Sequence, residues 1–347
     1  MQRMRLVILV APVVMLMSPV HGARAATTAD TVSRFDSISA LTVNATPTVE
    51  ALTAADGPAI LRAQILLDRA RFSPGVLNGR VTENMTRAVY FFQKSNGLRP
   101  TGRLDSATYQ RLVARGGRAD AVTRVRLTPR DVRGPYRWVP ISVYEQEDLS
   151  CLCYASALEM LDERYHTVTA VLEKLNPRVQ FGALTVGMEL WVPNVEPFDI
   201  SAPRSQILPK PIAKIRVAKS GRYLHALAAD GSILFHFPTT VGSAYDPSPT
   251  GIYRVSSVQW KPVFRYNPAL YSDVPDSRPT AMLRPGPNSP VGIVWIATSR
   301  QHLGIHGTPL PHTIGIASSH GCVRLTNWDA ARLAGAVRAG TIIEVKS

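Results

Sequence analysis

The 347-residue sequence predicts a multi-domain protein with a small all-α domain of three helices, an α+β module and a mainly β C-terminal domain that carries a helix near its end. Three observations lead to this prediction. The chain is longer than one small domain, and 45% of its residues are apolar, which is enough for several cores. Apolar residues recur at helical spacing in residues 57–115. Short alternating runs separated by Gly-containing turns dominate residues 212–347.

Residues 1–25 have the pattern of a secretory signal peptide, with a basic start, twelve mostly apolar residues at 6–17, and Ala-Arg-Ala before residue 26. The alternative is an uncleaved anchor, but twelve apolar residues interrupted by Pro12 are too few to span a bilayer. We therefore expect cleavage, no stable transmembrane anchor, and a location in the periplasm or cell envelope. Residues 26–56 are rich in small polar residues and lack periodicity, which predicts a linker.

The formal net charge of +14 would suit binding to nucleic acid, but no recognition helix or RNA-binding motif supports that function. For an exported protein, anionic wall and membrane surfaces are the expected electrostatic partners. We therefore expect no nucleic-acid partner.

Three helices are predicted in residues 57–115: one from Gly57 onward, one over 84–95 and one over 106–113. The segment resembles the peptidoglycan-binding domain type 1. The landmarks of that resemblance are Leu61, Gln64, Leu67, Pro74-Gly75-Val76-Leu77-Asn78-Gly79, Thr86, Ala88-Val89, Phe92-Gln93, Gly97-Leu98, Thr101-Gly102, Thr108 and Leu112. The resemblance implies binding to peptidoglycan, although Asn78 stands where relatives usually have Asp. The alternative is a generic three-helix packing unit, which does not account for the repeated Gly and Gln landmarks.

Residues 116–150 carry several arginines and prolines, which predicts a basic connector. Residues 151–196 follow with two short predicted helices, 156–164 and 168–175, and a strand-like run at 189–193. This layout resembles a degenerate LysM module. The matching residues are Ser156-Ala157-Leu158-Glu159-Met160-Leu161, Tyr165-His166, Leu172, Leu175-Asn176-Pro177, Val186-Gly187 and Leu190-Trp191-Val192-Pro193. The resemblance implies binding to N-acetylglucosamine-containing glycan strands. A structural spacer is the alternative, because the usual Gly-Asp-Thr start is missing.

The chain has three cysteines, too few for a disulfide scaffold. Cys151 and Cys153 would close a very small, strained ring if bridged, which favours free thiols, and their spacing indicates no function. A metal site built on this pair lacks the second cysteine half that zinc sites have.

Residues 212–347 are predicted to form a mainly β sandwich or open barrel of largely antiparallel strands. The predicted strands are 212–218, 223–228, 233–237, 252–258, 292–297 and 341–345, and the predicted helix is 327–337. Residues 261–290 contain many prolines and the aromatic residues Phe264, Tyr266 and Tyr271. We expect either a loop that covers a substrate or a plain surface excursion.

The C-terminal domain contains one cysteine, Cys322, which directly follows His320-Gly321 and lies sixteen residues after His306. A cysteine attacks carbonyl groups as the thiolate, so a nucleophilic cysteine needs a neighbouring base, and a histidine supplies one. Backbone N–H groups around Gly321 and Cys322 could face an oxyanion. The alternative is a small buried cysteine among satisfied core histidines. Clustering argues against it, because four of the eight histidines lie within nineteen residues: His302, His306, His312 and His320.

These residues resemble the signature of the L,D-transpeptidases, the YkuD or ErfK family. The matching positions are His306 and Ser319-His320-Gly321-Cys322-Val323-Arg324, with further landmarks at Val241-Gly242, Pro249-Thr250-Gly251-Ile252-Tyr253 and Ile305-His306-Gly307-Thr308. The resemblance implies that Cys322 is the nucleophile, His306 its general base and His320 a neighbour of the oxyanion. It also implies that Arg324, with Ser319 and Gly321, binds the substrate. Some relatives have Ser after the first His; Gly307 keeps the backbone carbonyl that orients the imidazole.

By the same resemblance, the expected substrate is a peptidoglycan stem peptide. Attack on the bond between a diamino acid and D-alanine would give a thioester, which an amine resolves as a 3→3 cross-link or as attachment of an outer-membrane lipoprotein. Water as the acceptor would make the enzyme a carboxypeptidase. No metal or organic cofactor is expected.

Two other functions remain open from the sequence. The four clustered histidines are sufficient in number for a zinc hydrolase, but no glutamate beside them offers a general base, and Cys322 would have no role. A non-catalytic scaffold that binds peptidoglycan would need only the two N-terminal modules, and would leave the histidine and cysteine pattern without a purpose.

Overall fold

The computed structural model describes residues 33–201 and 205–347. The predicted signal peptide, residues 1–25, lies outside the described residues, as does the beginning of the predicted linker. Within the described part of the chain, no helix is both long enough and apolar enough to cross a membrane.

Residues 33–56 belong to the predicted linker, yet they are folded. They form the 3-10 helix η1 (Phe35–Ser37) and the short helices α1 (Ala40–Asn44) and α2 (Val49–Leu52). Val43 is the buried residue of α1 and Leu52 that of α2, so neither helix has the repeated apolar spacing by which a sequence reveals a helix.

The three helices predicted in residues 57–115 are confirmed as α3 (Pro58–Arg69), α4 (Glu83–Ser95) and α5 (Ser106–Gly116). Thr82 and Asp105 cap α4 and α5, because their side chains accept hydrogen bonds from backbone N–H groups in the first turn. The apolar faces of the three helices meet in one core, which includes Ile60, Leu66, Leu67, Met85, Val89, Phe92 and Leu112.

Two buried glutamines hold the loops of this domain in place. Gln64 accepts a hydrogen bond from Gly79 N (2.8 Å), and Gln93 accepts one from Gly102 N (2.9 Å). Each amide group also donates to the carbonyl of the residue after its glycine. Both glycines have φ near +70°, a conformation that glycine adopts at little cost. The Gly and Gln landmarks noted in the sequence are therefore explained by these hydrogen bonds, which hold each loop against its helix. Asn78 belongs to the same set, because its Oδ1 accepts from Gln64 at 3.0 Å.

The central segment, residues 117–196, lies between the three-helix domain and the C-terminal domain in the sequence. It contains β1 (Val122–Arg126), α6 (Pro129–Arg133), α7 (Val143–Glu147), α8 (Ala157–Arg164), α9 (Thr169–Leu175), the 3-10 helix η2 (Phe181–Ala183) and β2 (Glu189–Pro193). The two helices and the strand predicted in residues 151–196 are confirmed. Residues 116–150 are not a simple connector, because β1 pairs antiparallel with β2 across more than sixty residues of chain. The periodicity of one five-residue strand does not reveal so distant a partner.

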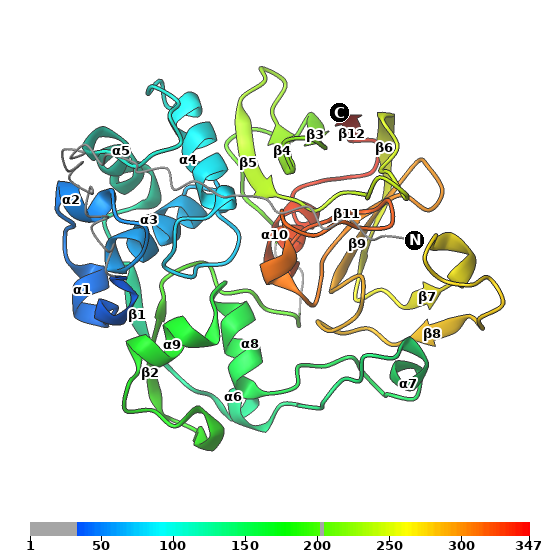
Figure 1. Cartoon of the computed structure of the whole chain (residues 1–347), viewed down its shortest axis with the longest axis horizontal. Helices are drawn as coiled ribbons and strands as arrows, with labels where there is room; N and C mark the ends of the chain where they lie inside the picture. The colour runs from blue at the N-terminus through cyan, green and yellow to red at the C-terminus, as the bar shows by residue number, and fades with distance from the viewer. Residues whose placement is uncertain (1–32, 202–204) are drawn as a thin grey trace, which may run out of the picture. The chain divides into compact units, whose positions relative to one another are not determined.

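The C-terminal domain contains one eight-stranded sheet in the order β11-β10-β9-β6-β12-β3-β4-β5 (Figure 1). Its strands are β3 (Lys214–Ala218), β4 (Tyr223–Leu227), β5 (Ile233–Pro238), β6 (Gly251–Trp260), β9 (Val294–Thr298), β10 (Gly304–His306), β11 (Val323–Arg324) and β12 (Ile342–Lys346). The predicted antiparallel pairing holds for most neighbours, but β12 pairs parallel with β3 and β10 parallel with β11.

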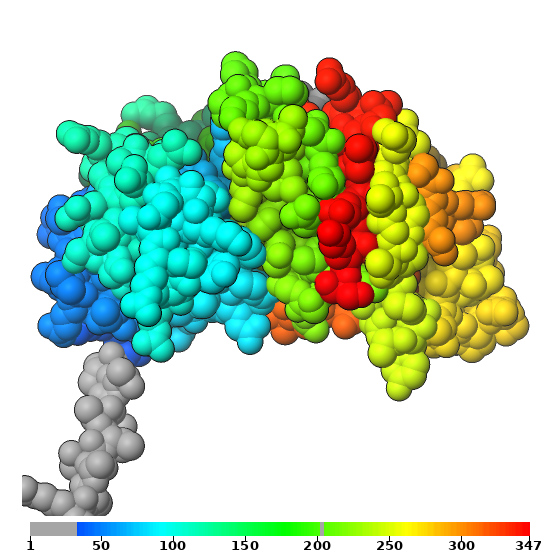
Figure 2. All heavy atoms as spheres, turned by 90° about the horizontal axis from the view of Figure 1, so that it is seen from above, coloured from blue at the N-terminus to red at the C-terminus, as the bar shows by residue number. Residues whose placement is uncertain are grey.

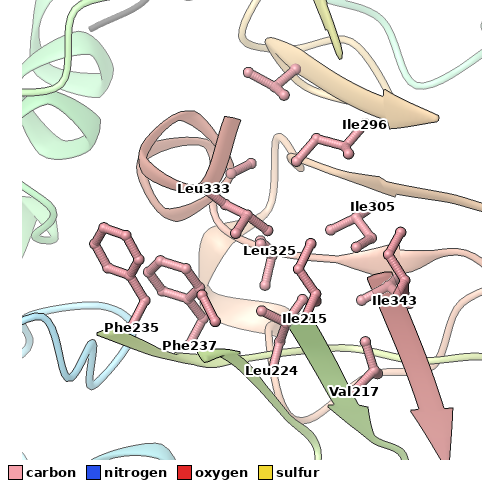
Figure 3. Packing of buried hydrophobic residues seen from close by; sticks show 14 of the residues in the cluster. Ile215, Val217, Leu224, Phe235, Phe237, Ile296, Ile305, Leu325, Leu333 and Ile343 are labelled. Carbon is pink, nitrogen blue, oxygen red and sulfur yellow. The ribbon is translucent and has the colours of Figure 1, made fainter. Parts of the chain in front are cut away.

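The sequence predicts a sandwich or an open barrel for this domain, and the structure shows a single curled sheet in place of two packed sheets. The long strand β6 pairs with β12 through its first half and with β9 through its second half, with a shift in register between Val255 and Ser257. Such a bulge bends a strand and increases its twist, so both halves of the sheet face one core. In Figure 3, Ile215 and Leu224 from one half lie near Ile296 and Ile305 from the other, with side chains of the predicted C-terminal helix, α10 (Asn327–Ala334), among them.

Residues 261–290 contain a small hairpin, β7 (Phe264–Tyr266) with β8 (Ala281–Leu283), and the 3-10 helix η3 (Pro268–Leu270). A further 3-10 helix, η4 (Pro311–Thr313), lies between β10 and β11. Part of the central segment packs on the hairpin: Leu152 is fully buried with Ala281 and Leu283. Its backbone N–H donates to Pro285 O, and its carbonyl accepts from Asn288 N.

Cys151 and Cys153 form a disulfide, contrary to the free thiols that their spacing favoured. Their Cα atoms lie 5.2 Å apart, which is within the range that a disulfide spans. The sequence does not reveal this, because the residue between the two cysteines, Leu152, is held by contacts with residues far along the chain, Pro285 and Asn288.

Three parts of the chain meet at a buried carboxylate. Asp68 of α3 is fully enclosed; it accepts two hydrogen bonds from Arg332 of α10 (2.8 and 3.0 Å) and one contact of 3.0 Å from His166 of the central segment. The helix α4 also lies against β5, with Phe91 packed on the rings of His225 and His236 (Figures 1 and 2). The helical domain is therefore docked on the sheet.

We expect Asp68→Ala to lower the free energy of unfolding by about 3–5 kcal/mol, because it leaves the guanidinium of Arg332 buried without its carboxylate. Urea unfolding followed by circular dichroism measures the change. Asp36→Ala is the matched control, because Asp36 pairs with Lys174 on the surface and its side chain is 82% exposed. Equal stability of the Asp68 variant and the parent would contradict the interpretation.

Candidate active site

The predicted histidine and cysteine lie on neighbouring strands. Strand β10 ends at His306, and β11 begins directly after Cys322. The strands pair parallel, with Ile305 opposite Val323 and His306 opposite Arg324. The side chains of the two predicted catalytic residues border one groove of about 400 Å³. The groove is lined by Gln259, Pro262, Val263, Phe264, Arg265, Leu270, Tyr271, Pro290, Val291, Trp295, His302, His306, His320, Cys322 and Arg324.

Cys322 is the one free thiol of the chain. Its Sγ donates to the backbone carbonyl of His302 at 3.5 Å. Burial raises the pKa of the thiol above its ordinary value, and this effect exceeds the opposing influence of Gly304 N–H and of the charge on Arg324. The resting cysteine is therefore a protonated thiol that needs a base when it reacts.

His306 is held as a neutral imidazole. Its ring is 3% exposed, stacks on Trp295 and donates from Nδ1 to the carbonyl of Gly307 at 2.7 Å. Burial, together with the nearby charge of Arg324, lowers the pKa of His306 to about 3. The hydrogen bond at Nδ1 assigns the proton to that nitrogen, which leaves Nε2 without a proton. The carbonyl of Gly307 accepts this hydrogen bond in the structure, and its predicted part in orienting the imidazole during catalysis stays a prediction.

The turn before Cys322 is fixed from both sides. Ser319 is buried, and its hydroxyl donates to the carbonyl of Cys322 at 2.5 Å. The hydroxyl of Ser248 donates to the carbonyl of Gly321 at 2.7 Å and accepts from Gly242 N at 2.9 Å. Gly321 has φ +104°, where a side chain would be strained. The predicted contribution of Ser319 and Gly321 to substrate binding stays a prediction; in this structure both residues shape the turn.

His320 lies at the rim of the groove beside the 261–290 segment. Its Nε2 contacts the carboxylate of Asp273 at 2.9 Å, and its ring packs edge-on against Tyr271. Tyr271 lines the groove, and burial raises its pKa to about 12. The segment predicted as either a covering loop or a surface excursion thus forms one wall of the groove.

Arg324 brings a positive charge to the groove. Its backbone N–H donates to Thr240 O, and its own carbonyl accepts from Thr240 N, so its position is set by the chain near the Val241-Gly242 landmark. Burial lowers the pKa of its guanidinium, and the Nε atom has no hydrogen-bond partner among the described residues. A partly buried cation with an unpaired donor favours a carboxylate ligand.

The clustered histidines do not gather at one point. His302, His306 and His320 line the groove, whereas His312 borders a separate hollow together with Arg222 and Asn84. In residues 33–201 and 205–347, no group of three or more His, Cys, Asp or Glu side chains is placed to hold a metal ion.

Several residues of the site were not singled out from the sequence. Trp295 stacks on His306, Asp273 contacts His320, and Ser248 holds the cysteine turn. Ser248 directly precedes the Pro249-Thr250-Gly251 landmark, which was a usable signal. Trp295 and Asp273 belong to a strand and a loop without a motif, so only the folded chain reveals them.

Two stretches of the chain match known protein families. Residues 213–345 match the YkuD family, described as "L,D-transpeptidase catalytic domain". Residues 56–112 match a family described as "Putative peptidoglycan binding domain". Residues 213–345 are therefore similar in sequence to L,D-transpeptidase catalytic domains.

Curated relatives of the chain are named L,D-transpeptidases. The chain is 28% identical over 188 residues to a Bacillus licheniformis protein named "Putative L,D-transpeptidase YkuD", a match that covers 54% of this chain and 92% of that protein. It is 29% identical over 153 residues to "Probable L,D-transpeptidase ErfK/SrfK" of Escherichia coli, which covers 42% of this chain and 48% of that protein.

Solved structures show a weaker likeness. An L,D-transpeptidase from Mycobacterium smegmatis is 22% identical, with a TM-score of 0.33 over 39% of this chain and 59% of that one. An L,D-transpeptidase from Xylanimonas cellulosilytica is 15% identical, with a TM-score of 0.36 over 84% and 95% of the two chains. The likeness of residues 213–345 to L,D-transpeptidases rests on the sequence matches and not on these scores.

We expect alkylation of Cys322 by iodoacetamide to accelerate steadily from pH 6 past the ordinary thiol pKa of 9.0, because the thiol is protonated at rest. No inflection is expected near the ordinary histidine pKa of 6.5, since His306 stays neutral in this range. Intact-mass measurement of the adduct gives the rate at each pH, and Cys322→Ser is the blank. A rate that is already constant below pH 7 would indicate a preformed thiolate and contradict this account.

We expect Gly307→Ala to destabilise the fold by about 1–3 kcal/mol, because the added methyl group overpacks a filled space. A Cβ at this position would lie 2.0 Å from Oδ1 of Asn327. Gly182→Ala is the matched control, because a Cβ there has no heavy atom within 4 Å. Thermal unfolding compares the two variants, and an unchanged midpoint for Gly307→Ala would show that Asn327 moves aside freely.

Proposed function

We propose that the chain is a cysteine L,D-transpeptidase that acts on peptidoglycan stem peptides. The observation that carries the proposal is the groove in which the free thiol of Cys322 and the unprotonated edge of His306 lie beside the cation of Arg324. The family match of residues 213–345 supports the same reaction class.

In the proposed reaction, Nε2 of His306 takes the thiol proton as the sulfur of Cys322 bonds to the carbonyl carbon between the diamino acid and D-alanine. The tetrahedral intermediate collapses when the amine of D-alanine leaves with the proton from His306. A thioester remains on Cys322. An acceptor amine then attacks the thioester, gives its proton to His306 and releases the enzyme as a thiol.

The surrounding residues would take the parts predicted for them from the sequence. Arg324 would pair with a carboxylate of the stem peptide. His320 and the backbone around Gly321 would stabilise the oxyanion, with Asp273 holding the imidazole. The low pKa of His306 keeps its base form available over the whole physiological range.

The rest of the chain would bind the peptidoglycan cell wall and so hold this site close to its substrate. The domain matched at residues 56–112 would bind peptidoglycan, and the LysM-like segment would bind glycan strands or act as a spacer. Cleavage of a signal peptide would release the protein into the periplasm or cell envelope. The acceptor amine would come from a second stem peptide, giving a 3→3 cross-link, or from an outer-membrane lipoprotein.

Two alternatives use the same surfaces. Water as the acceptor would give a carboxypeptidase. A scaffold without catalysis would use the peptidoglycan-binding domain alone. The product distinguishes them, because cross-linking, trimming and simple binding leave muropeptides of different mass.

We expect the mature protein to convert purified disaccharide-tetrapeptides into 3→3 dimers with release of D-alanine, and Cys322→Ala to form no product. His306→Ala should lose about 10²- to 10⁴-fold in rate, which is the usual contribution of a general base. Mass spectrometry of the muropeptides measures both, and a carbapenem adduct on Cys322 provides a second readout.

His312→Ala is the matched control, because this exposed histidine of the same cluster lies outside the groove. D-alanine release by Cys322→Ala would exclude the proposed nucleophile. Formation of tripeptide without any dimer would identify the protein as a carboxypeptidase. A tetrapeptide that is bound but stays unchanged would identify it as a non-catalytic scaffold.

A further inference from the structure

A buried amide lies directly behind the proposed general base. Asn327, the first residue of α10, is fully buried. Its Oδ1 accepts from Ile293 N (3.1 Å), and its Nδ2 donates to Pro287 O (3.1 Å) and to Oε1 of Glu163 (2.8 Å). Because each donor and acceptor has one suitable partner, the orientation of the amide is determined by this network.

The same amide fills a space that two glycines leave open. A Cβ on Gly307 would lie 2.0 Å from Oδ1 of Asn327, and one on Gly292 would lie 1.9 Å from the same atom. The amide therefore touches the backbone of Gly307, whose carbonyl accepts the Nδ1 proton of His306. A shift of Asn327 would move the carbonyl that determines the tautomer and the direction of the imidazole.

The central segment holds the amide from the other side. Glu163 of α8 is 7% exposed; its Oε1 accepts from Asn327, and its Oε2 shares a hydrogen bond of 2.5 Å with the hydroxyl of Tyr154. A chain of contacts thus runs from Tyr154 through Glu163 and Asn327 to Gly307 and His306. Its first two members lie in residues 113–212, the stretch between the two family matches.

We propose that Glu163 and Asn327 are positioning residues for His306, so that the central segment completes the active site in addition to joining the two matched domains. The proposal rests on the proposed function, in which His306 is the general base. It assigns a task to the stretch that neither family match covers.

Glu163→Ala tests the proposal, with Glu163→Gln and Asp162→Ala beside it. Glu163→Gln keeps the shape and an acceptor oxygen; burial raises the pKa of Glu163 to about 8, so the acid is mostly neutral at pH 7 and glutamine resembles it. Asp162 is the matched control on the same helix: it also accepts a side-chain hydrogen bond, but from Thr169 within the central segment.

The readout separates positioning from binding and from folding. The first-order rate constant for acylation of Cys322 by a carbapenem should fall about 10- to 100-fold in Glu163→Ala, with little change in the half-saturating concentration. Glu163→Gln and Asp162→Ala should keep rates within about twofold of the parent. If Glu163→Ala does not fold, Tyr154→Phe replaces it, and a smaller loss in the same direction is expected.

A second measurement does not depend on activity. Ring ¹⁵N chemical shifts of histidine, with the His306 signals identified by their absence in His306→Gln, report which nitrogen carries the proton. We expect the proton on Nδ1 in the parent and in Glu163→Gln, and a mixture of tautomers in Glu163→Ala.

The outcomes are distinguishable. A folded Glu163→Ala protein with the parent's tautomer and acylation rate overturns the positioning role, as does an equal loss in Asp162→Ala. If the parent itself is not acylated while the tautomer still depends on Glu163, the proposed function fails and the positioning of His306 stands.

Discussion

The carboxylate of Asp68 is enclosed where the helical domain, the central segment and the sheet domain meet. Removing a carboxylate and a guanidinium from water is costly, and only close pairing with additional hydrogen bonds compensates for it. Although burial alone would raise the pKa of Asp68, the charge of Arg332 holds it below its ordinary value. The pair therefore requires both domains to be in place, and the helix that supplies Arg332, α10, also begins with the amide behind His306. The short helix α10 therefore contributes both to the docking of the domains and to the support of the site.

At the candidate active site, burial determines which protonation states of Cys322 and His306 are favoured. Enclosure disfavours charge on both reacting groups: it raises the pKa of Cys322 and lowers that of His306. Both shifts favour the neutral thiol and the neutral imidazole at rest, and in the proposed reaction the proton would move as the carbonyl carbon is attacked. A protonated thiol is also less open to oxidation than a thiolate. With Cys151 and Cys153 already bridged, the described chain offers Cys322 no other thiol with which to pair.

The sequence predicts what is local in this protein. The three helices of the first domain, the short strands after residue 212 and the His306 and Cys322 signature all depend on spacing within short stretches of the chain. The pairing of β1 with β2, the contact of Glu163 with Asn327 and the curl of the sheet at Val255 join residues far apart in the chain. The Cys151–Cys153 disulfide is local in sequence, but its geometry is set by the hairpin on which Leu152 packs. Pattern reasoning has no means to anticipate such distant partners.

At Gly307, the sequence resemblance and the structure give complementary information. By family resemblance, some L,D-transpeptidases carry Ser after the first histidine, and the sequence alone suggests that this chain merely lost a side chain. In the structure, Oδ1 of Asn327 occupies the place where a Cβ would stand, and the amide continues to Glu163. A chain with Ser at 307 would need a smaller residue at 327 and would thereby lose the link to the central segment. Gly307 is therefore matched to its surroundings: the absent side chain makes room for a support that comes from another part of the protein.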